Sequence, residues 1–127
     1  MEGGLVGIHQ LVGGLVVVAM IVVVIFAAIQ AAGADSRWTR SASFVAAGLL
    51  LLQYILGVIL LGNGFSNTAT HYVIAVLVLV PVALEHSSAK RLSVQTRGLA
   101  MLIWALAAAF LAVIAYLTGL WGAPVAG

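Results

Sequence analysis

The chain has 127 residues, of which 65% are hydrophobic and only 6% carry a charged side chain. Such a composition excludes a water-soluble globular domain and indicates an integral membrane protein whose surface meets a lipid bilayer. Five Lys and Arg residues against three acidic residues leave a net charge of +2, too small an excess to predict nucleic-acid binding.

Four apolar runs follow one another, each near the length of about 20 residues that a transmembrane helix needs. They cover residues 5–32, 42–61, 69–84 and 99–120. The connections between them are short, so consecutive helices should be antiparallel neighbours. The sequence therefore predicts an all-α integral membrane fold, an up-down-up-down bundle of four transmembrane helices that forms one domain over residues 1–127.

The cations predict the orientation of the bundle in the membrane. All of them fall between the first and second runs or between the third and fourth: Arg37, Arg40, Lys90, Arg91 and Arg97. Because cytoplasmic loops are enriched in Lys and Arg, loops 33–41 and 85–98 are expected in the cytoplasm. Both termini would then lie outside, in a multi-pass protein of the inner (plasma) membrane.

Two histidines stand out because each lies a few residues inside the outer end of an apolar run. His9 is followed four positions later by Gly13, and His71 is followed four positions later by Ala75. Residues four apart share a helix face, so a small residue there leaves room for a flat macrocycle beside an imidazole. At matched depths, His9 and His71 could be the two axial ligands of one haem b per chain.

The second run repeats this spacing with Gln53 and Gly57, at a depth close to that of the two histidines. The Gln53 carboxamide could hydrogen-bond a ring substituent or an ordered water in the same cavity. Interhelical hydrogen bonding is the plainer alternative for Gln53, and also for Gln10. A stripe of small residues in the fourth run predicts close helix packing and leaves a homodimer open: Ala105, Ala108, Ala112, Ala115 and Gly119.

His86 lies fifteen residues after His71, which is roughly 60° of rotation and about 22 Å along a helix. It is therefore a possible metal ligand at the inner side, but no second histidine lies there to complete a haem site. The alternative is an ordinary charged helix end, formed with the neighbouring Glu85, Lys90 and Arg91.

Short motifs around these residues resemble known haem proteins. The run LQYILG at residues 52–57, preceded by His9 and followed by His71 and Ala75, looks like one half of haem A synthase, a haem-binding membrane enzyme of two four-helix halves. The stretch HSSAKR at residues 86–91 is similar to one in small four-helix membrane proteins described as cytochrome b-like. The resemblance implies His9 and His71 as axial ligands.

The chain is not expected to be an enzyme. Haem A synthase carries a glutamate three residues before its first histidine and an arginine after it, where this chain has Val6 and Gln10. The synthase also has a second haem site for its substrate, whereas this chain matches one half. No carboxylate falls within a predicted span, and no serine is placed with a histidine base.

The function favoured by the sequence is a b-type haem-binding membrane subunit, working in electron transfer or as a haem-stabilised component of a larger respiratory or photosynthetic complex. Two imidazoles would fill both axial positions of the iron, which suits electron transfer. The short loops leave little surface for a soluble redox partner, so other membrane subunits are the expected partners. The alternatives are a cofactor-free accessory subunit and a subunit that binds a pigment or quinone through a single histidine.

Overall fold

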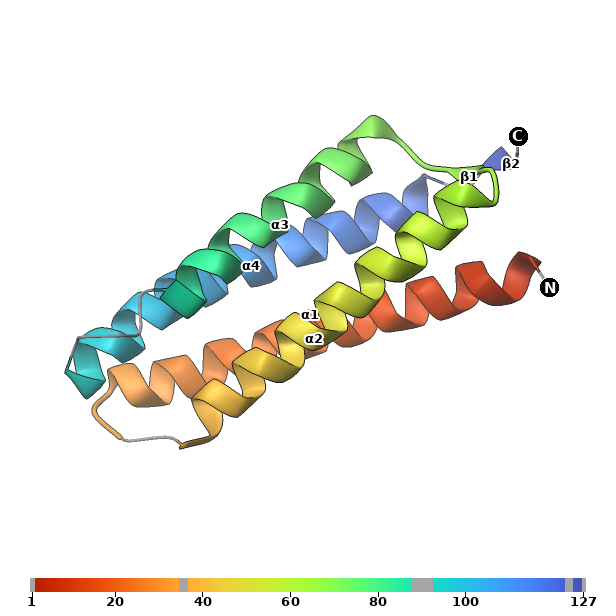
Figure 1. Cartoon of the computed structure of the whole chain (residues 1–127). Coiled ribbons are helices and arrows are strands. Elements are labelled where there is room, and N and C mark those ends of the chain that lie inside the picture. Colours follow the sequence, from red (N-terminus) through yellow and green to blue (C-terminus); the bar gives the residue numbers. More distant parts are fainter. Residues whose placement is uncertain (1, 35–36, 88–92, 123–124, 127) are drawn as a thin grey trace.

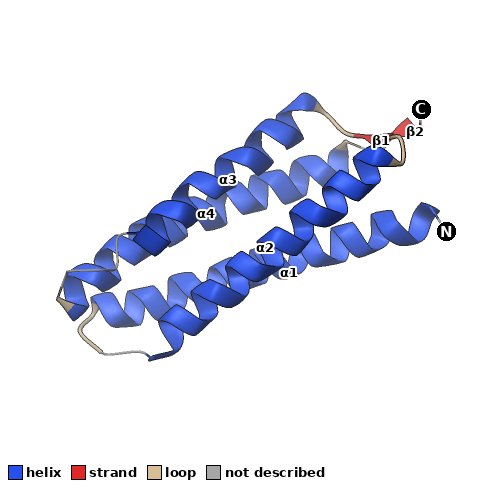
Figure 2. Cartoon of the chain, viewed as in Figure 1, coloured by secondary structure: helices blue, strands red, loops and turns tan. Residues whose placement is uncertain are grey.

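The computed structural model describes residues 2–34, 37–87, 93–122 and 125–126 and consists mainly of four long helices (Figures 1 and 2). The helices are α1 (Glu2–Ala31), α2 (Arg37–Gly62), α3 (Ala69–Ser87) and α4 (Val94–Trp121). Each helix is long and apolar enough to cross a membrane. The prediction of an all-α, multi-pass bundle of four transmembrane helices is therefore confirmed.

The helix ends differ from the predicted ones, because hydropathy marks the apolar stretch and not the last hydrogen-bonded turn. α2 begins at Arg37 and α4 at Val94, five residues before their predicted starts, and α3 runs on to Ser87. The predicted loops 33–41 and 85–98 were consequently too long. Glu85 and His86 lie within α3, so the expectation that no carboxylate falls within a span is wrong.

The closest helix pairs are α1 with α4, α3 with α4, and α1 with α2. α2 and α3 face each other across the bundle and are joined by side chains, as for Tyr54, whose hydroxyl donates to the Ala75 carbonyl. Figure 1 shows both chain ends at one end of the bundle, with the α1–α2 and α3–α4 connections at the other. The described cations Arg37, Arg40 and Arg97 belong to the first turns of α2 and α4, at the connection end.

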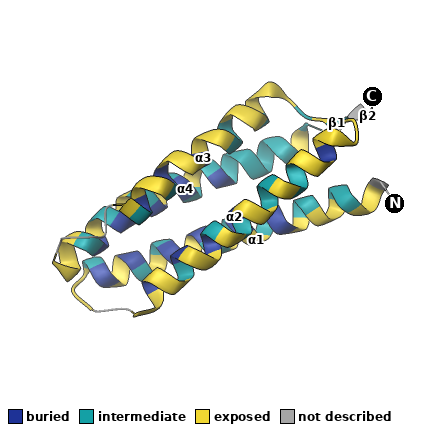
Figure 3. Ribbon diagram, in the orientation of Figure 1, coloured by how far each residue is buried: buried dark blue, intermediate teal, exposed yellow. Residues whose placement is uncertain are grey.

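The core runs along the shared face of α1 and α4, where medium-sized side chains pack against alanines (Figure 3). Met20 and Val23 of α1 are 1% exposed, and Ala108 of α4 is fully buried. The predicted small stripe of α4 thus packs inside the chain, where small residues let helix backbones approach. Large aliphatic side chains cover the outside, as expected of a surface that faces lipid.

A short strand pair lies at the end of the bundle that carries the termini. β1 (Phe65–Ser66) follows α2 and pairs antiparallel with β2 (Val125–Ala126). Gly64 turns the chain between α2 and β1 with a φ of 84°, a conformation that glycine adopts without steric cost. The pair brings the α2–α3 connection beside the C-terminal segment, and Phe65 and Ser66 line a pocket at this end of the bundle.

Candidate functional site

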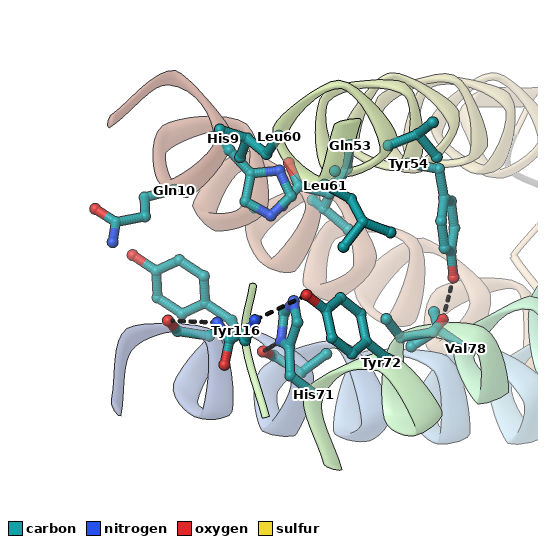
Figure 4. A pocket seen from close by; sticks show the side chains of 18 of the residues that line it. His9, Gln10, Gln53, Tyr54, Leu60, Leu61, His71, Tyr72, Val78 and Tyr116 are labelled. Atoms are coloured by element: carbon teal, nitrogen blue, oxygen red, sulfur yellow. Dashed lines mark hydrogen bonds between the residues drawn. The ribbon is translucent and has the colours of Figure 1, made fainter. Parts of the chain in front are cut away.

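A cavity of about 250 Å³ opens between the four helices near the termini. All six residues predicted as cofactor-binding line it: His9, Gly13, Gln53, Gly57, His71 and Ala75. Most of the remaining lining is aliphatic, and Tyr54, Tyr72 and Tyr116 supply aromatic rings (Figure 4). A largely apolar cavity with a few converging polar groups is the usual form of a cofactor site.

The two imidazoles face each other across this cavity, His9 from α1 and His71 from α3 (Figure 4). Their ring centroids are 6.5 Å apart and their planes make an angle of 75°. Two in-line metal–imidazole bonds of about 2 Å, with each ring centre roughly 1.1 Å beyond its nitrogen, place the centroids about 6 Å apart. The observed 6.5 Å is close to that spacing, and it also lies within the range of an ordinary edge-to-face pair of rings.

His71 is held in one tautomer by α4. Its Nδ1 lies 2.9 Å from the backbone carbonyl of Ala115. A carbonyl can only accept, so Nδ1 carries the proton and donates it, and the neutral ring keeps its lone pair on Nε2. A ligating histidine commonly has this second hydrogen bond, which orients the ring.

His9 is held from α2. Its Nε2 lies 3.2 Å from the Nε2 of Gln53. The other ring nitrogen, Nδ1, is buried and has no hydrogen-bond partner within the part of the chain that the structure describes, and the same holds for the Gln53 carbonyl oxygen. Buried polar atoms without partners are costly, so the pocket has unmet bonding capacity beside His9.

The predicted small residues have more specific roles than leaving a slot. A Cβ at Gly13 would come within 3.0 Å of Gln53 Nε2 and 3.2 Å of the Tyr116 ring, so this glycine makes room for those side chains. A Cβ at Gly57 would meet His9 Cε1 at 3.4 Å. Gly13 thus allows Gln53 to enter the pocket, whereas a Cβ at Gly57 would make an ordinary van der Waals contact with His9.

Sequence reasoning missed the contribution of α4, because its contacts with His71 come from Ala115 and Gly119, two members of the small-residue stripe that predicts helix packing. His71 lies against Gly119, where a Cβ would come within 3.0 Å of the imidazole Cε1. The Ala115 carbonyl is one turn earlier and accepts from the same ring. The sequence signal for this contact was the pair of small residues Ala115 and Gly119, four apart in one predicted helix, with a histidine at a similar depth in another.

His86, the possible third ligand, lies at the opposite end of α3. Its Nδ1 is 2.9 Å from the Val82 carbonyl and its Nε2 is 3.3 Å from the Ser43 hydroxyl. Both nitrogens of His86 have hydrogen-bond partners, so this ring offers no free nitrogen to a metal. The expectations that Glu85 forms an ordinary charged end and that no serine stands with a histidine are wrong, because Ser43 also donates to the buried Glu85 carboxylate.

No group of three or more His, Asp or Glu side chains converges anywhere in the described residues. Comparison of the chain with protein-family models, curated proteins and solved structures finds no match. The geometry of the pocket is therefore the basis for assigning a function.

Proposed function

We propose that the chain is a small b-type cytochrome-like membrane subunit that holds one haem between His9 and His71. The observation that carries the proposal is the 6.5 Å separation of the two facing imidazoles in an apolar cavity. A bound haem would supply a one-electron carrier whose iron has both axial positions filled by imidazole.

The residues around the pair support this assignment. The Ala115 carbonyl holds the proton of His71 on Nδ1 and so leaves Nε2 as a donor to iron. With the Gln53 amide turned so that its oxygen accepts from His9 Nε2–H, the buried Nδ1 would hold the lone pair that a metal needs. The mostly aliphatic lining suits a macrocycle that is itself mostly apolar.

The placement in the membrane belongs to the same proposal. Arg37, Arg40 and Arg97 begin the helices at the connection end of the bundle. By the excess of cations in cytoplasmic loops, that end lies in the cytoplasm, and the His9–His71 site lies near the outer face of the plasma membrane. Electrons would pass to or from other membrane subunits, as in a respiratory or photosynthetic complex.

The test is a reduced-minus-oxidised absorption spectrum of the purified protein in mild detergent, with a pyridine haemochrome assay for stoichiometry. We expect a sharp α band of low-spin haem b and about one haem per chain. His9→Leu and His71→Leu should each abolish that band, whereas His86→Asn should keep it. If the bound chromophore is not haem and is lost in only one of the first two variants, the site would hold a pigment on a single histidine.

A protein isolated gently with its neighbours and showing no haem band would overturn the proposal. The cofactor-free accessory subunit would then be the better account, with His9, Gln53 and His71 serving to join helices.

A further inference from the structure

A second polar cluster lies at the connection end of the bundle, formed by Ser43 of α2 with Glu85 and His86 of α3. Ser43 is 5% exposed and Glu85 is 2% exposed, although both lie in membrane-spanning helices. The Ser43 hydroxyl donates to the Glu85 carboxylate. His86 Nε2 lies 3.3 Å from the same hydroxyl oxygen, so Ser43 is placed between an acid and a base.

The hydrogen-bond contacts allow two arrangements of the protons, and both keep a proton on His86 Nδ1. His86 Nδ1, 2.9 Å from the Val82 carbonyl, must carry a proton, because a carbonyl only accepts. In the first arrangement, the Ser43 hydroxyl donates its single proton to the Glu85 carboxylate. The contact between Nε2 and Ser43 is then a hydrogen bond only if Nε2 also carries a proton, so this arrangement is carboxylate, hydroxyl and imidazolium in series.

A second arrangement has the same atoms and the same total charge. The carboxyl proton of Glu85 would be donated to Ser43 Oγ, and the Ser43 proton would be donated to a neutral His86 Nε2. The two forms interconvert when one proton passes from the carboxyl to Oγ while the hydroxyl proton passes from Oγ to Nε2. The Glu85 O–H and Ser43 O–H bonds break, new Ser43 O–H and His86 N–H bonds form, and no electrons are transferred.

We propose that Ser43, Glu85 and His86 form a proton-transfer site, in which the Ser43 hydroxyl relays a proton between the buried Glu85 carboxylate and the His86 imidazole. His86 is the half-buried member, in the last turn of α3, and is therefore the surface end of the relay. Glu85 is the interior end. Chains of acidic and histidine side chains inside membrane proteins commonly carry protons.

The surroundings of the cluster fit this role. The Phe44 ring meets the His86 ring edge-on at 5.3 Å, and the Arg40 guanidinium lies 5.5 Å from the centre of the Phe44 ring. The other charged side chains that the structure describes at this end are Arg37 of α2 and Arg97 of α4, and the last turns of α1 have none. Glu85 is the one carboxylate whose side chain is described, so the relay lies among cations.

The site is separate from the haem pocket. Glu85 is fourteen residues from His71 along α3, about 21 Å at the rise of a helix. None of the cluster residues lines the pocket. The relay can therefore be tested on protein with or without haem, and its failure would leave the haem proposal unaffected.

Nuclear magnetic resonance of the full-length chain in detergent micelles, labelled with ¹⁵N-histidine and ¹³C-glutamate, tests the proposal. The chain has three histidines, so His9 and His71 report in the same spectrum whether each variant keeps its fold. At neutral pH we expect the His86 nitrogens of an imidazolium and the Glu85 carbon of a carboxylate. Glu85→Gln should convert His86 to the neutral Nδ1–H form, and His86→Gln should convert Glu85 to the protonated acid.

Ser43→Ala should produce both changes at once, because the connecting hydroxyl is gone, and Ser43→Thr should restore the wild-type signals. Ser41→Ala, an exposed serine two residues away on α2, is the matched control and should change neither signal. A His86 that keeps its wild-type signals in Glu85→Gln, or a neutral His86 beside an ionised Glu85 in the wild type, would overturn the relay. So would wild-type signals in Ser43→Ala, since the two groups would then not exchange a proton through the hydroxyl.

Discussion

Gly119 of α4 lies directly against the imidazole of His71 of α3, where a Cβ would come within 3.0 Å of Cε1 and 3.3 Å of Nδ1. The ring also donates from Nδ1 to the Ala115 carbonyl one turn earlier. The absence of a side chain at Gly119 thus lets the imidazole approach the α4 backbone closely enough to make that bond.

Gly119→Ala should therefore disturb the position of His71. The added methyl group displaces the ring or breaks its bond to Ala115, and loss of such an orienting bond lowers metal affinity about 10–100-fold. Titration of haem into the purified variant, followed by the absorption band, measures the effect. Gly48→Ala on α2 is the control, because no atom lies within 4 Å of a Cβ there, and haem affinity equal to wild type in both variants would contradict the assignment.

Gly98→Ala should destabilise the whole bundle. A Cβ at Gly98 would come within 2.5 Å of the Ala31 nitrogen and 2.6 Å of the Gln30 carbonyl carbon, and these backbone atoms cannot move without separating α1 from α4. Overpacking of this kind costs about 1–3 kcal/mol of unfolding free energy. Denaturant titration in micelles measures the loss, and Gly48→Ala should unfold within about 0.5 kcal/mol of wild type.

Tyr54→Phe removes the hydrogen bond from α2 to the Ala75 carbonyl on α3, which joins two helices that are not closely packed. We expect a loss of about 0.5–1.5 kcal/mol in unfolding free energy, the usual range for an interhelical hydrogen bond in a membrane protein. Tyr72→Phe is the comparison. The Tyr72 hydroxyl accepts from the Asn67 backbone N–H in a solvent-exposed hydrogen bond, and water can take the place of the lost hydroxyl. A larger loss for Tyr72→Phe than for Tyr54→Phe would be evidence against the bridging role.

Gln53→Leu should weaken haem binding without abolishing it. The variant keeps the size of the side chain but removes the amide that holds His9 Nε2 at 3.2 Å, so the ring is no longer oriented from α2. An affinity about 10–100-fold lower is expected from the loss of an orienting partner. Gln10→Leu, at the same pocket, should bind haem as the wild type does, and equal losses in both variants would mean that pocket polarity alone is responsible.

Both predicted ligands and their i,i+4 partners line one cavity, which could be anticipated because helix periodicity and depth are properties of the local sequence. The roles of Gly13 and Gly57 could not be anticipated. Whether a glycine leaves an open slot or receives a particular side chain depends on which residue of another helix lies opposite, here Gln53 and His9.

Glu85, at the other end of the bundle, also shows the difference between what the local sequence predicts and what the packing of the helices determines. In the sequence it stands among His86, Lys90 and Arg91 and resembles a solvated helix end, yet in the structure it is 2% exposed and accepts a hydrogen bond from Ser43, forty-two residues earlier. Hydropathy is summed along the chain, so it predicts how many helices cross the membrane and which loops carry the cations. The partner of a buried polar group depends on the rotation and spacing of neighbouring helices, which packing determines, so only the folded bundle brings Ser43 to Glu85 and His9 to His71.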